Sequence, residues 1–306
     1  MVIKGMLIVL VFLTIWFIYI FGKDHIKAKA EGRIEKEGNP IFFAFLGVVI
    51  NFFDALGIGS FAVATAVFKI GKVMDDDMIP GTLNVATTTS LISEAFIYMS
   101  IVAIDGWTVL LTIICAMVGA YVGASIVTKL PKKKIQIGMG IALLIVGILL
   151  VMGMVGLLDM NGTAIGLRGI KLVIACVVCF ILGMTNCIGI GMFAPTMAMA
   201  AILGLSPIVA YPIMTGGSAF LQPIASYKFI KENAFNRKLS FIWSICGVIG
   251  VVIAAFLVKS LPVNILKVVV VIVVAYTSIS MFVSAFKKSD VSVEEKTKNK
   301  IAEAIS

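Results

Sequence analysis

The sequence predicts an all-α polytopic membrane protein, and three observations carry this prediction. Of the 306 residues, 60% are hydrophobic and only 13% are charged. The mean hydropathy is +1.11, whereas a soluble domain is about 45–50% apolar even when glycine is counted. The apolar segments come near the ~20 residues that a helix needs to cross a membrane, and a transmembrane barrel would show short alternating segments instead.

Nine apolar segments predict helices separated by short loops. They are Val2–Phe21, Ile41–Ile70, Ile79–Ile104, Trp107–Val127, Ile135–Leu157, Leu167–Leu203, Pro207–Phe229, Leu239–Val258 and Pro262–Phe286. The first begins with a single basic residue, Lys4, and lacks a small-residue cleavage site. We therefore expect a retained anchor, with a cleaved signal peptide as the alternative.

The chain contains an internal repeat with an offset of 132 residues. The stretch GIGSFAVATAVFKI from Gly57 aligns with GIGMFAPTMAMAAI from Gly189, and Pro80 then falls on Pro212 without a gap. The repeat predicts four parts. Residues 1–40 are an N-terminal transmembrane helix with a cytosolic loop, 41–158 and 159–286 are the two transmembrane repeats, and 287–306 are a cytosolic tail.

The distribution of Lys and Arg favours a hairpin in each of the two longest segments. If each segment crossed once, 16 of the 25 basic residues would lie inside, whereas 20 lie inside if each segment dips in and returns. The second arrangement agrees better with the positive-inside rule. Each half then holds one re-entrant hairpin and three full crossings, so the two repeats are predicted to be inverted. Inverted repeats with broken helices are typical of secondary transporters that work by alternating access.

The glycine motifs are the predicted hinges of these hairpins. Glycine permits a bend and a close approach of a ligand to the backbone, and freed backbone groups at membrane depth must face protein or a water-filled cavity. The half-helices would direct N–H groups and a positive dipole end into that cavity. We therefore expect an anion site made by Gly57, Gly59, Ser60, Gly189 and Gly191.

Small polar residues follow a proline in each half. The first half supplies Thr82, Asn84, Thr87 and Thr88, and the second supplies Thr215, Gly216, Gly217, Ser218 and Gln222. Hydroxyl and amide groups can replace the hydration shell of a small oxyanion, so we assign these residues, apart from Thr88, to the substrate site. Helix packing is the alternative, since Gly, Ser and Thr also line close helix contacts.

Two acidic residues are predicted at membrane depth, where a carboxylate costs at least ~2.5 kcal/mol. We expect Asp54 to take up a proton as the anion moves, with Glu94 as the second proton-coupling candidate. The alternative for Asp54 is a cap on the free N–H groups of the broken helix, and for Glu94 it is pairing with a neighbour. The repeat places Asn186 at the position equivalent to Asp54, and we assign Asn186 to the substrate site.

The residue types argue against a metal, a cofactor or an enzyme. Cys176 and Cys179 form a C-x-x-C without a neighbouring His or acidic ligand, and the only histidine is His25 in the charged loop. We find no nucleophile–base pair and no phosphate-binding loop. The formal charge of +9 is explained by topology rather than by nucleic acid. We therefore expect no catalytic residue, metal, cofactor or nucleic-acid partner.

The two halves resemble the TauE/SafE family of sulfite and organosulfonate exporters. The resemblance is carried by GVVINFFDALGIGSFAVATAVFKI…IPGTLN and FILGMTNCIGIGMFAPTMAMAAILGLSPIVAYPIMTGGSAF. It implies a proton-driven transporter in the cytoplasmic membrane that exports a small sulfur oxyanion. Ser60, and Val63 in place of Pro195 of the second half, depart from the family pattern and leave the particular anion open.

Alternative functions from other classes fit the same fold. They are a cation or metal transporter and a non-transporting membrane scaffold or assembly factor. The expected partners are a small anion and the lipid bilayer, and the sequence leaves open whether the chain forms a homo-oligomer.

Overall fold

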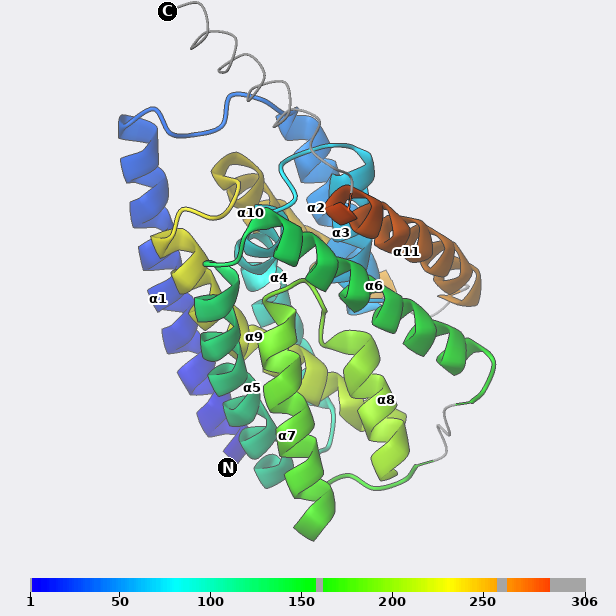
Figure 1. Cartoon of the computed structure of the whole chain (residues 1–306). Helices are drawn as coiled ribbons and strands as arrows, with labels where there is room; N and C mark the ends of the chain where they lie inside the picture. Colours follow the sequence, from blue (N-terminus) through cyan, green and yellow to red (C-terminus); the bar gives the residue numbers. More distant parts are fainter. Residues whose placement is uncertain (1, 158–161, 258–262, 287–306) are drawn as a thin grey trace, which may run out of the picture.

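The computed structural model describes residues 2–157, 162–257 and 263–286. Within these ranges the chain forms eleven α-helices and no strand, only an isolated bridge between Ala164 and Leu205. In chain order (Figure 1) the helices are α1 Val2–Ala30, α2 Pro40–Ala55, α3 Ser60–Ile70, α4 Ile79–Ile101, α5 Gly106–Val127, α6 Lys132–Met154, α7 Gly169–Asn186, α8 Phe193–Leu203, α9 Pro207–Lys231, α10 Arg237–Leu257 and α11 Val263–Phe286. The predicted all-α class is confirmed. The predicted tail, 287–306, lies outside the described residues.

Helix α1 is longer than the sequence predicted. It was expected to end at Phe21, but it continues to Ala30 through the charged residues that follow the apolar run. Residues 22–30 include three lysines and two alanines, which are good helix formers, so loss of hydrophobicity does not end the helix. The chain turns only at Gly32, whose φ of +67° is a conformation that favours glycine.

Both long apolar segments are broken at their glycine motifs, as predicted. Residues 56–59 separate α2 from α3, and residues 187–192 separate α7 from α8. Gly57, Gly59 and Gly189 have φ values of +87°, +89° and +104°, which other residues rarely adopt. The glycines therefore set the positions of the two breaks.

Each broken segment returns to the end of the molecule from which it started. In the second, the Nζ of Lys171 near the start of α7 donates to the carbonyl of Leu203 at the end of α8, at 3.0 Å; Figure 1 shows the two helices side by side. In the first, Glu37 before α2 and Lys69 near the end of α3 line one cavity of about 600 Å³. We call α2–α3 hairpin 1 and α7–α8 hairpin 2.

The helix contacts follow the internal repeat: when each helix is replaced by its equivalent 132 residues away, one contact becomes another contact that is also present. Helix α4 packs against its repeat equivalent α9, and α6 packs against its equivalent α11. The other pairs exchange between halves: α2 packs on α10 while α7 packs on α5, and α3 contacts α11 while α8 contacts α6. Each hairpin is therefore held by helices of the other half, and α1 lies outside this pattern.

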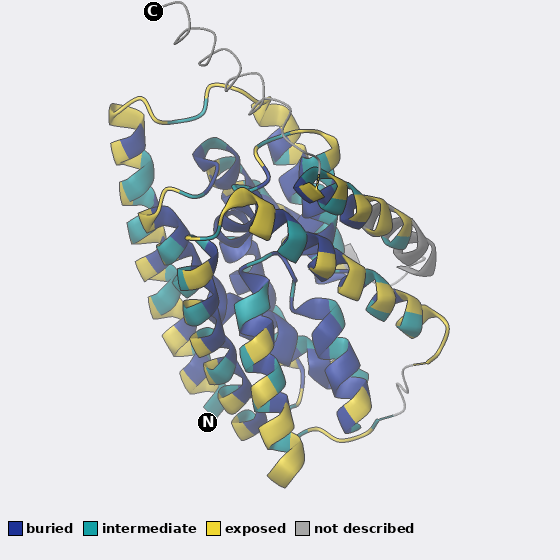
Figure 2. Ribbon diagram, viewed as in Figure 1, coloured by how far each residue is buried: buried dark blue, intermediate teal, exposed yellow. Residues whose placement is uncertain are grey.

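Helices α4 and α9 form the centre of the molecule, where Figure 2 shows continuous burial. Both carry polar side chains on several faces, and most of their residues are buried. They are not among the five described helices that are long and apolar enough to cross a membrane, which are α1, α5, α6, α7 and α10. The outer helices expose large apolar side chains such as Phe12, Ile148 and Val173, as a lipid-facing surface requires.

Small residues allow α5 and α7 to approach closely. A methyl group added to Gly119 or Gly183 would lie 2.0 Å from the carbonyl oxygen of Phe180 or 2.1 Å from that of Ala116, respectively. A methyl group added to Gly123 would likewise lie 2.4 Å from the carbonyl oxygen of Met184. Close backbone contact through small residues is a common way for membrane helices to associate.

Basic residues gather at one end of the described molecule. Lys69 pairs with Asp76, Lys132 pairs with Asp75 at 2.7 Å, and the α1 end is joined to α10 by Arg237 and Asp24. Further links at this end join Lys238 to the loop before α2 and Lys69 to Ser284 of α11. We call it the basic end. It holds the four described groups of basic residues that the hairpin arrangement places in the cytosol, which lie in residues 23–36, 69–72, 129–134 and 228–238.

The opposite end, which we call the outer end, holds Lys4, Arg168 and Lys171. Asp105 there accepts hydrogen bonds from the backbone N and the hydroxyl of Thr108, both at 2.8 Å, and so caps α5. Arg168 binds both carboxylate oxygens of Asp105 at 2.8 and 2.9 Å. The guanidinium of Arg168, followed by the Thr108 hydrogen bonds, holds the pKa of Asp105 well below its usual value.

Candidate functional site

The tips of the two hairpins contact each other in a crossed manner. A methyl group added to Gly59 would lie 3.4 Å from the Cβ of Phe193, and one added to Gly191 would lie 3.1 Å from the Cβ of Phe61. Gly59 and Gly191 are repeat equivalents, as are Phe61 and Phe193. The two halves therefore make the same contact in both directions.

The space between the tips is nearly filled. The cavity there measures about 10 Å³ and is lined by Ile58, Gly59, Phe61, Ala62, Val146, Gly191, Phe193 and Ala194. One water molecule needs ~10–15 Å³, so this conformation leaves no room for an oxyanion directly between the glycines. The polar groups lie beside the tips, against α4 and α9.

Asp54 caps the second helix of hairpin 1. Its Oδ1 accepts a hydrogen bond of 2.7 Å from the backbone N of Ser60, the first residue of α3, and Asp54 is fully buried. This is the capping arrangement that the sequence offered as the alternative to proton coupling. The Ser60 amide assigned to an anion is therefore occupied by a side chain of the protein in this conformation. Oδ2 of Asp54 has no hydrogen-bond partner among the described residues.

A second carboxyl group and two tyrosines lie close to Asp54. Glu94 is fully buried, neither of its carboxyl oxygens has a described partner, and it interacts electrostatically with Asp54. Tyr98 donates to the carbonyl of Ala55 at 2.5 Å and its ring lies 4.9 Å from that of Tyr211. A methyl group added to Gly57 would lie 2.7 Å from the Tyr211 hydroxyl. We call Asp54, Glu94, Tyr98 and Tyr211 the carboxyl cluster.

The tip of hairpin 2 carries an amide group instead, and a hydroxyl group of hairpin 1 lies near it. The Nδ2 of Asn186 donates to the Oδ1 of Asn84 on α4 at 3.1 Å, which brings together two predicted site residues from different halves. No side chain caps the N-terminus of α8. The hydroxyl oxygen of Thr65 would lie 3.9 Å from a methyl group added to Gly189. Hairpin 2 therefore presents neutral polar groups where hairpin 1 presents a carboxylate.

Polar side chains continue along the α4–α9 interface. Gln222 donates to the hydroxyl of Thr87 at 3.4 Å, and the hydroxyls of Thr88 and Ser226 lie 3.1 Å apart. Together with Asn84 and Asn186 these residues form what we call the amide cluster. Oε1 of Gln222 and Oδ1 of Asn186 are buried without a partner in the described part of the chain.

Other predicted site residues lie at the edge of these clusters or outside them. Thr82 accepts from the backbone N of Asn236 at 2.9 Å and so supports the start of α10. Thr215 donates to the carbonyl of Tyr211 within its own helix at 2.7 Å, and Ser218 is buried on α9. A methyl group on Gly216 would lie 3.0 Å from Sδ of Met99, and one on Gly217 would lie 3.1 Å from Sδ of Met192.

The sequence analysis missed several buried polar residues of the centre. Thr65 and Thr196 have hydroxyls without a described partner and lie inside the two glycine motifs, five and three positions after their half-helices begin at Ser60 and Phe193. Tyr98 and Tyr211 gave no signal because isolated tyrosines are common in membrane proteins. The two tyrosines come together only because α4, which carries Tyr98, packs against α9, which carries Tyr211.

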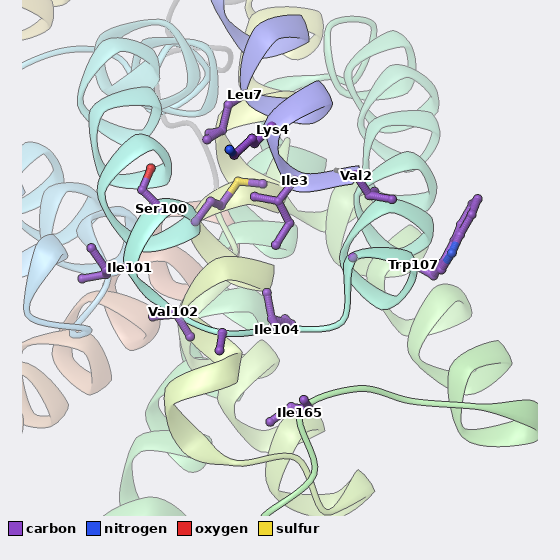
Figure 3. A pocket seen from close by; sticks show the side chains of 13 residues that line it. Val2, Ile3, Lys4, Leu7, Ser100, Ile101, Val102, Ile104, Trp107 and Ile165 are labelled. Carbon is purple, nitrogen blue, oxygen red and sulfur yellow. The ribbon is translucent and has the colours of Figure 1, made fainter.

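A pocket at the outer end approaches the centre. It has a volume of about 690 Å³ and is lined by Val2, Ile3, Lys4, Leu7, Met99, Ser100, Ile101, Val102, Ala103, Ile104, Gly106, Trp107 and Ile165. Figure 3 shows Lys4 and Leu7 projecting from α1 and Ser100 from α4. Met99 both lines this pocket and contacts Gly216 of α9. The Met99 side chain therefore lies between the outer pocket and the centre.

The comparison with protein families agrees with this architecture. A family model described as "Sulfite exporter TauE/SafE" matches residues 2–150 and 171–305. None of the curated proteins and none of the solved structures matches the chain. Within the described residues no three His, Cys, Asp or Glu side chains are placed to hold a metal ion. The match spans nearly the whole chain, including both hairpins, and so the chain belongs to the TauE/SafE sulfite exporter family of integral membrane transporters, which are not enzymes.

Proposed function

We propose that the protein exports sulfite or a short organosulfonate and binds it at the amide cluster. The observation that carries this placement is the uncapped start of α8 beside Asn84, Asn186 and Thr65. A helix N-terminus attracts an anion through its free N–H groups and its dipole, and the neighbouring hydroxyl and amide groups supply further donors. No buried lysine or arginine accompanies them in the described centre.

The partnerless oxygens favour an anion that carries its own proton. Asn186 and Gln222 each present a buried carbonyl oxygen without a described partner, and a buried acceptor left unsatisfied costs ~1–3 kcal/mol. A hydrogen sulfite ion has an O–H that can satisfy such an acceptor, while its other oxygens accept from hydroxyl and backbone donors. A site of mixed donors and acceptors suits this ion better than the fully ionised one.

Alternating access is the transport mechanism we propose, with the two repeats inverted. Hairpin 1 opens at the basic end and hairpin 2 at the outer end, and the helix contacts are related by the same offset as the sequence repeat. Inverted repeats that meet at broken helices provide two equivalent conformations of opposite sidedness. The proposed direction runs from the basic end, taken as cytosolic, past Met99 to the outer pocket.

The carboxyl cluster is the proposed coupling site. Two buried carboxyl groups that repel each other, with no described cation between them, are best accommodated when at least one carries a proton. Sodium is the second candidate, because the partnerless oxygens of Asp54 and Glu94 are ligands that a hard cation accepts.

Flux measurements on purified protein in proteoliposomes test this function. Labelled sulfite and a short sulfonate are compared with a cation, each with a pH gradient, a sodium gradient or neither. If a pH gradient accelerates the export of the sulfur oxyanions, the proposal is supported. If only a sodium gradient accelerates it, sodium is the coupling ion in place of the proton. Absence of flux for every sulfur oxyanion, alongside flux of the cation, refutes it.

A further inference from the structure

A second pocket lies at the basic end, where α1, the helix outside the repeat, meets helices of the second half. It has a volume of about 750 Å³, and its walls come from α1, α9, the residues that follow each of these helices and the first residue of α10. It is lined by Tyr19, Ile20, Lys23, Asp24, Lys27, Arg33, Tyr227, Ile230, Lys231, Asn233 and Arg237. Five of these residues are basic and one is acidic, so the pocket attracts an anion.

The acidic residue and one basic residue neutralise each other. Asp24 and Arg237 form a buried ion pair at 2.9 Å, while Lys27 and Arg33 both pair with the exposed Glu31. No ion pair joins Lys23 or Lys231 to a carboxylate of the described residues. The pocket therefore keeps an excess of positive charge after its internal pairs are counted.

The pocket lies at the depth where helices leave the hydrocarbon layer. Tyr19 and Tyr227 line it, and the ring of Tyr227 lies 5.6 Å from that of Trp16. Tyrosine and tryptophan concentrate at the level of lipid headgroups. Below this level α1 exposes Phe12 and Ile15, which form an apolar surface that can accompany an acyl chain.

We propose that this pocket binds the headgroup of an anionic phospholipid, with the phosphate facing Lys23, Lys27 and Lys231 and the acyl chains running along α1. Basic pockets between membrane helices on the cytoplasmic side are suited to anionic headgroups. The aromatic rim and the apolar surface below it distinguish this ligand from a soluble oxyanion, which would need neither. The bound lipid would contact both α1 and α9 and so stabilise their packing. The proposal does not depend on which substrate the protein transports.

Quenching of Trp16 fluorescence tests the proposal on the full-length protein in nanodiscs. The chain has three tryptophans; Trp107 is replaced by Phe, and Trp243 is retained because it is fully buried and beyond contact with lipid. Brominated phosphatidylglycerol is compared with brominated phosphatidylcholine. We expect stronger quenching by the anionic lipid, and a loss of up to about fivefold in this selectivity for each pocket lysine replaced by glutamine.

The matched control removes the same charge from the same end of the molecule. The test variant is Lys23→Gln, Lys27→Gln, Lys231→Gln, and the control is Lys129→Gln, Lys133→Gln, Lys134→Gln, whose lysines are exposed and lie outside the pocket. Loss of selectivity in the test variant alone supports the proposal. Equal losses in both variants, or no preference for the anionic lipid in the parent protein, overturn it. A soluble glycerophosphate is expected not to displace the lipid, and displacement would show that the pocket takes a free phosphate instead.

Discussion

Substitutions at Asp54 separate its two roles, the helix cap that the structure contains and the coupling site that we propose. The hydrogen bond from the Ser60 amide to Oδ1 is 2.7 Å long and fully buried. Asparagine and aspartate cap helices about equally well, so Asp54→Asn keeps this bond through its amide oxygen while it removes the ionisable group. Alanine removes both.

The expected cost follows from the geometry. Loss of an N-cap destabilises by ~0.5–2 kcal/mol, and the Ser60 amide left without an acceptor in a buried position brings Asp54→Ala to about 2–3 kcal/mol. Asp54→Asn should cost well under 1 kcal/mol. The thermal midpoint of the purified protein therefore falls clearly in the alanine variant and little in the asparagine variant.

Flux in proteoliposomes is the functional half of the experiment. The ratio of sulfite flux with and without a pH gradient should exceed one in the native protein and fall to about one in Asp54→Asn. Asp105→Asn, which removes a carboxylate at the outer end, is the control and should keep the native ratio. If Asp54→Asn keeps both its stability and the native ratio, Asp54 is only a cap and the coupling argument fails.

Three further predictions concern packing, pH and topology. Gly183→Val should prevent α5 and α7 from assembling, because even a methyl group there would lie 2.1 Å from a carbonyl oxygen; size-exclusion chromatography should show loss of the folded species, whereas Gly22→Ala, with nothing within 4 Å, should behave as native. The pKa of Asp105 is lowered by Arg168, so its stabilising contribution is present above its unfolded pKa of ~4 and lost as pH falls through the lower folded value; Asp105→Asn should lower the thermal midpoint at pH 7 by an amount that shrinks in acid, and an unchanged midpoint at pH 7 would contradict this. Cysteines placed at Lys36 before hairpin 1 and at Lys72 after it, on a background without native cysteines, should react with an impermeant reagent from the same side of the membrane, and labelling from opposite sides would refute the hairpin topology.

The breaks in the two long segments were predictable from the sequence because they depend on local chemistry. A positive φ at Gly57, Gly59 and Gly189 requires glycine, and the repeat marked the same motif twice. Asn84 and Asn186 were both assigned to one predicted site, but the hydrogen bond between them was not predicted.

Features that depend on long-range packing were not predictable in this way. Thr82 was assigned to the substrate site but supports Asn236, 154 positions away, and a single sequence does not reveal that contact. Nothing in the sequence pattern of α1 marked its extension to Ala30, since hydropathy reports burial in lipid rather than helix length. The filling of the space between the tips by Phe61 and Phe193 likewise depends on how the two hairpins meet.

The exchange of partners between the halves has a consequence for biosynthesis. Helix α2 ends at Ala55, but the helix on which it packs, α10, begins only at Arg237. Because a chain is synthesised from its N-terminus, hairpin 1 enters the membrane long before its partner exists. A fragment cut between the halves would leave each hairpin without its supporting helix, so the two halves can reach their native packing only when both are present in one membrane.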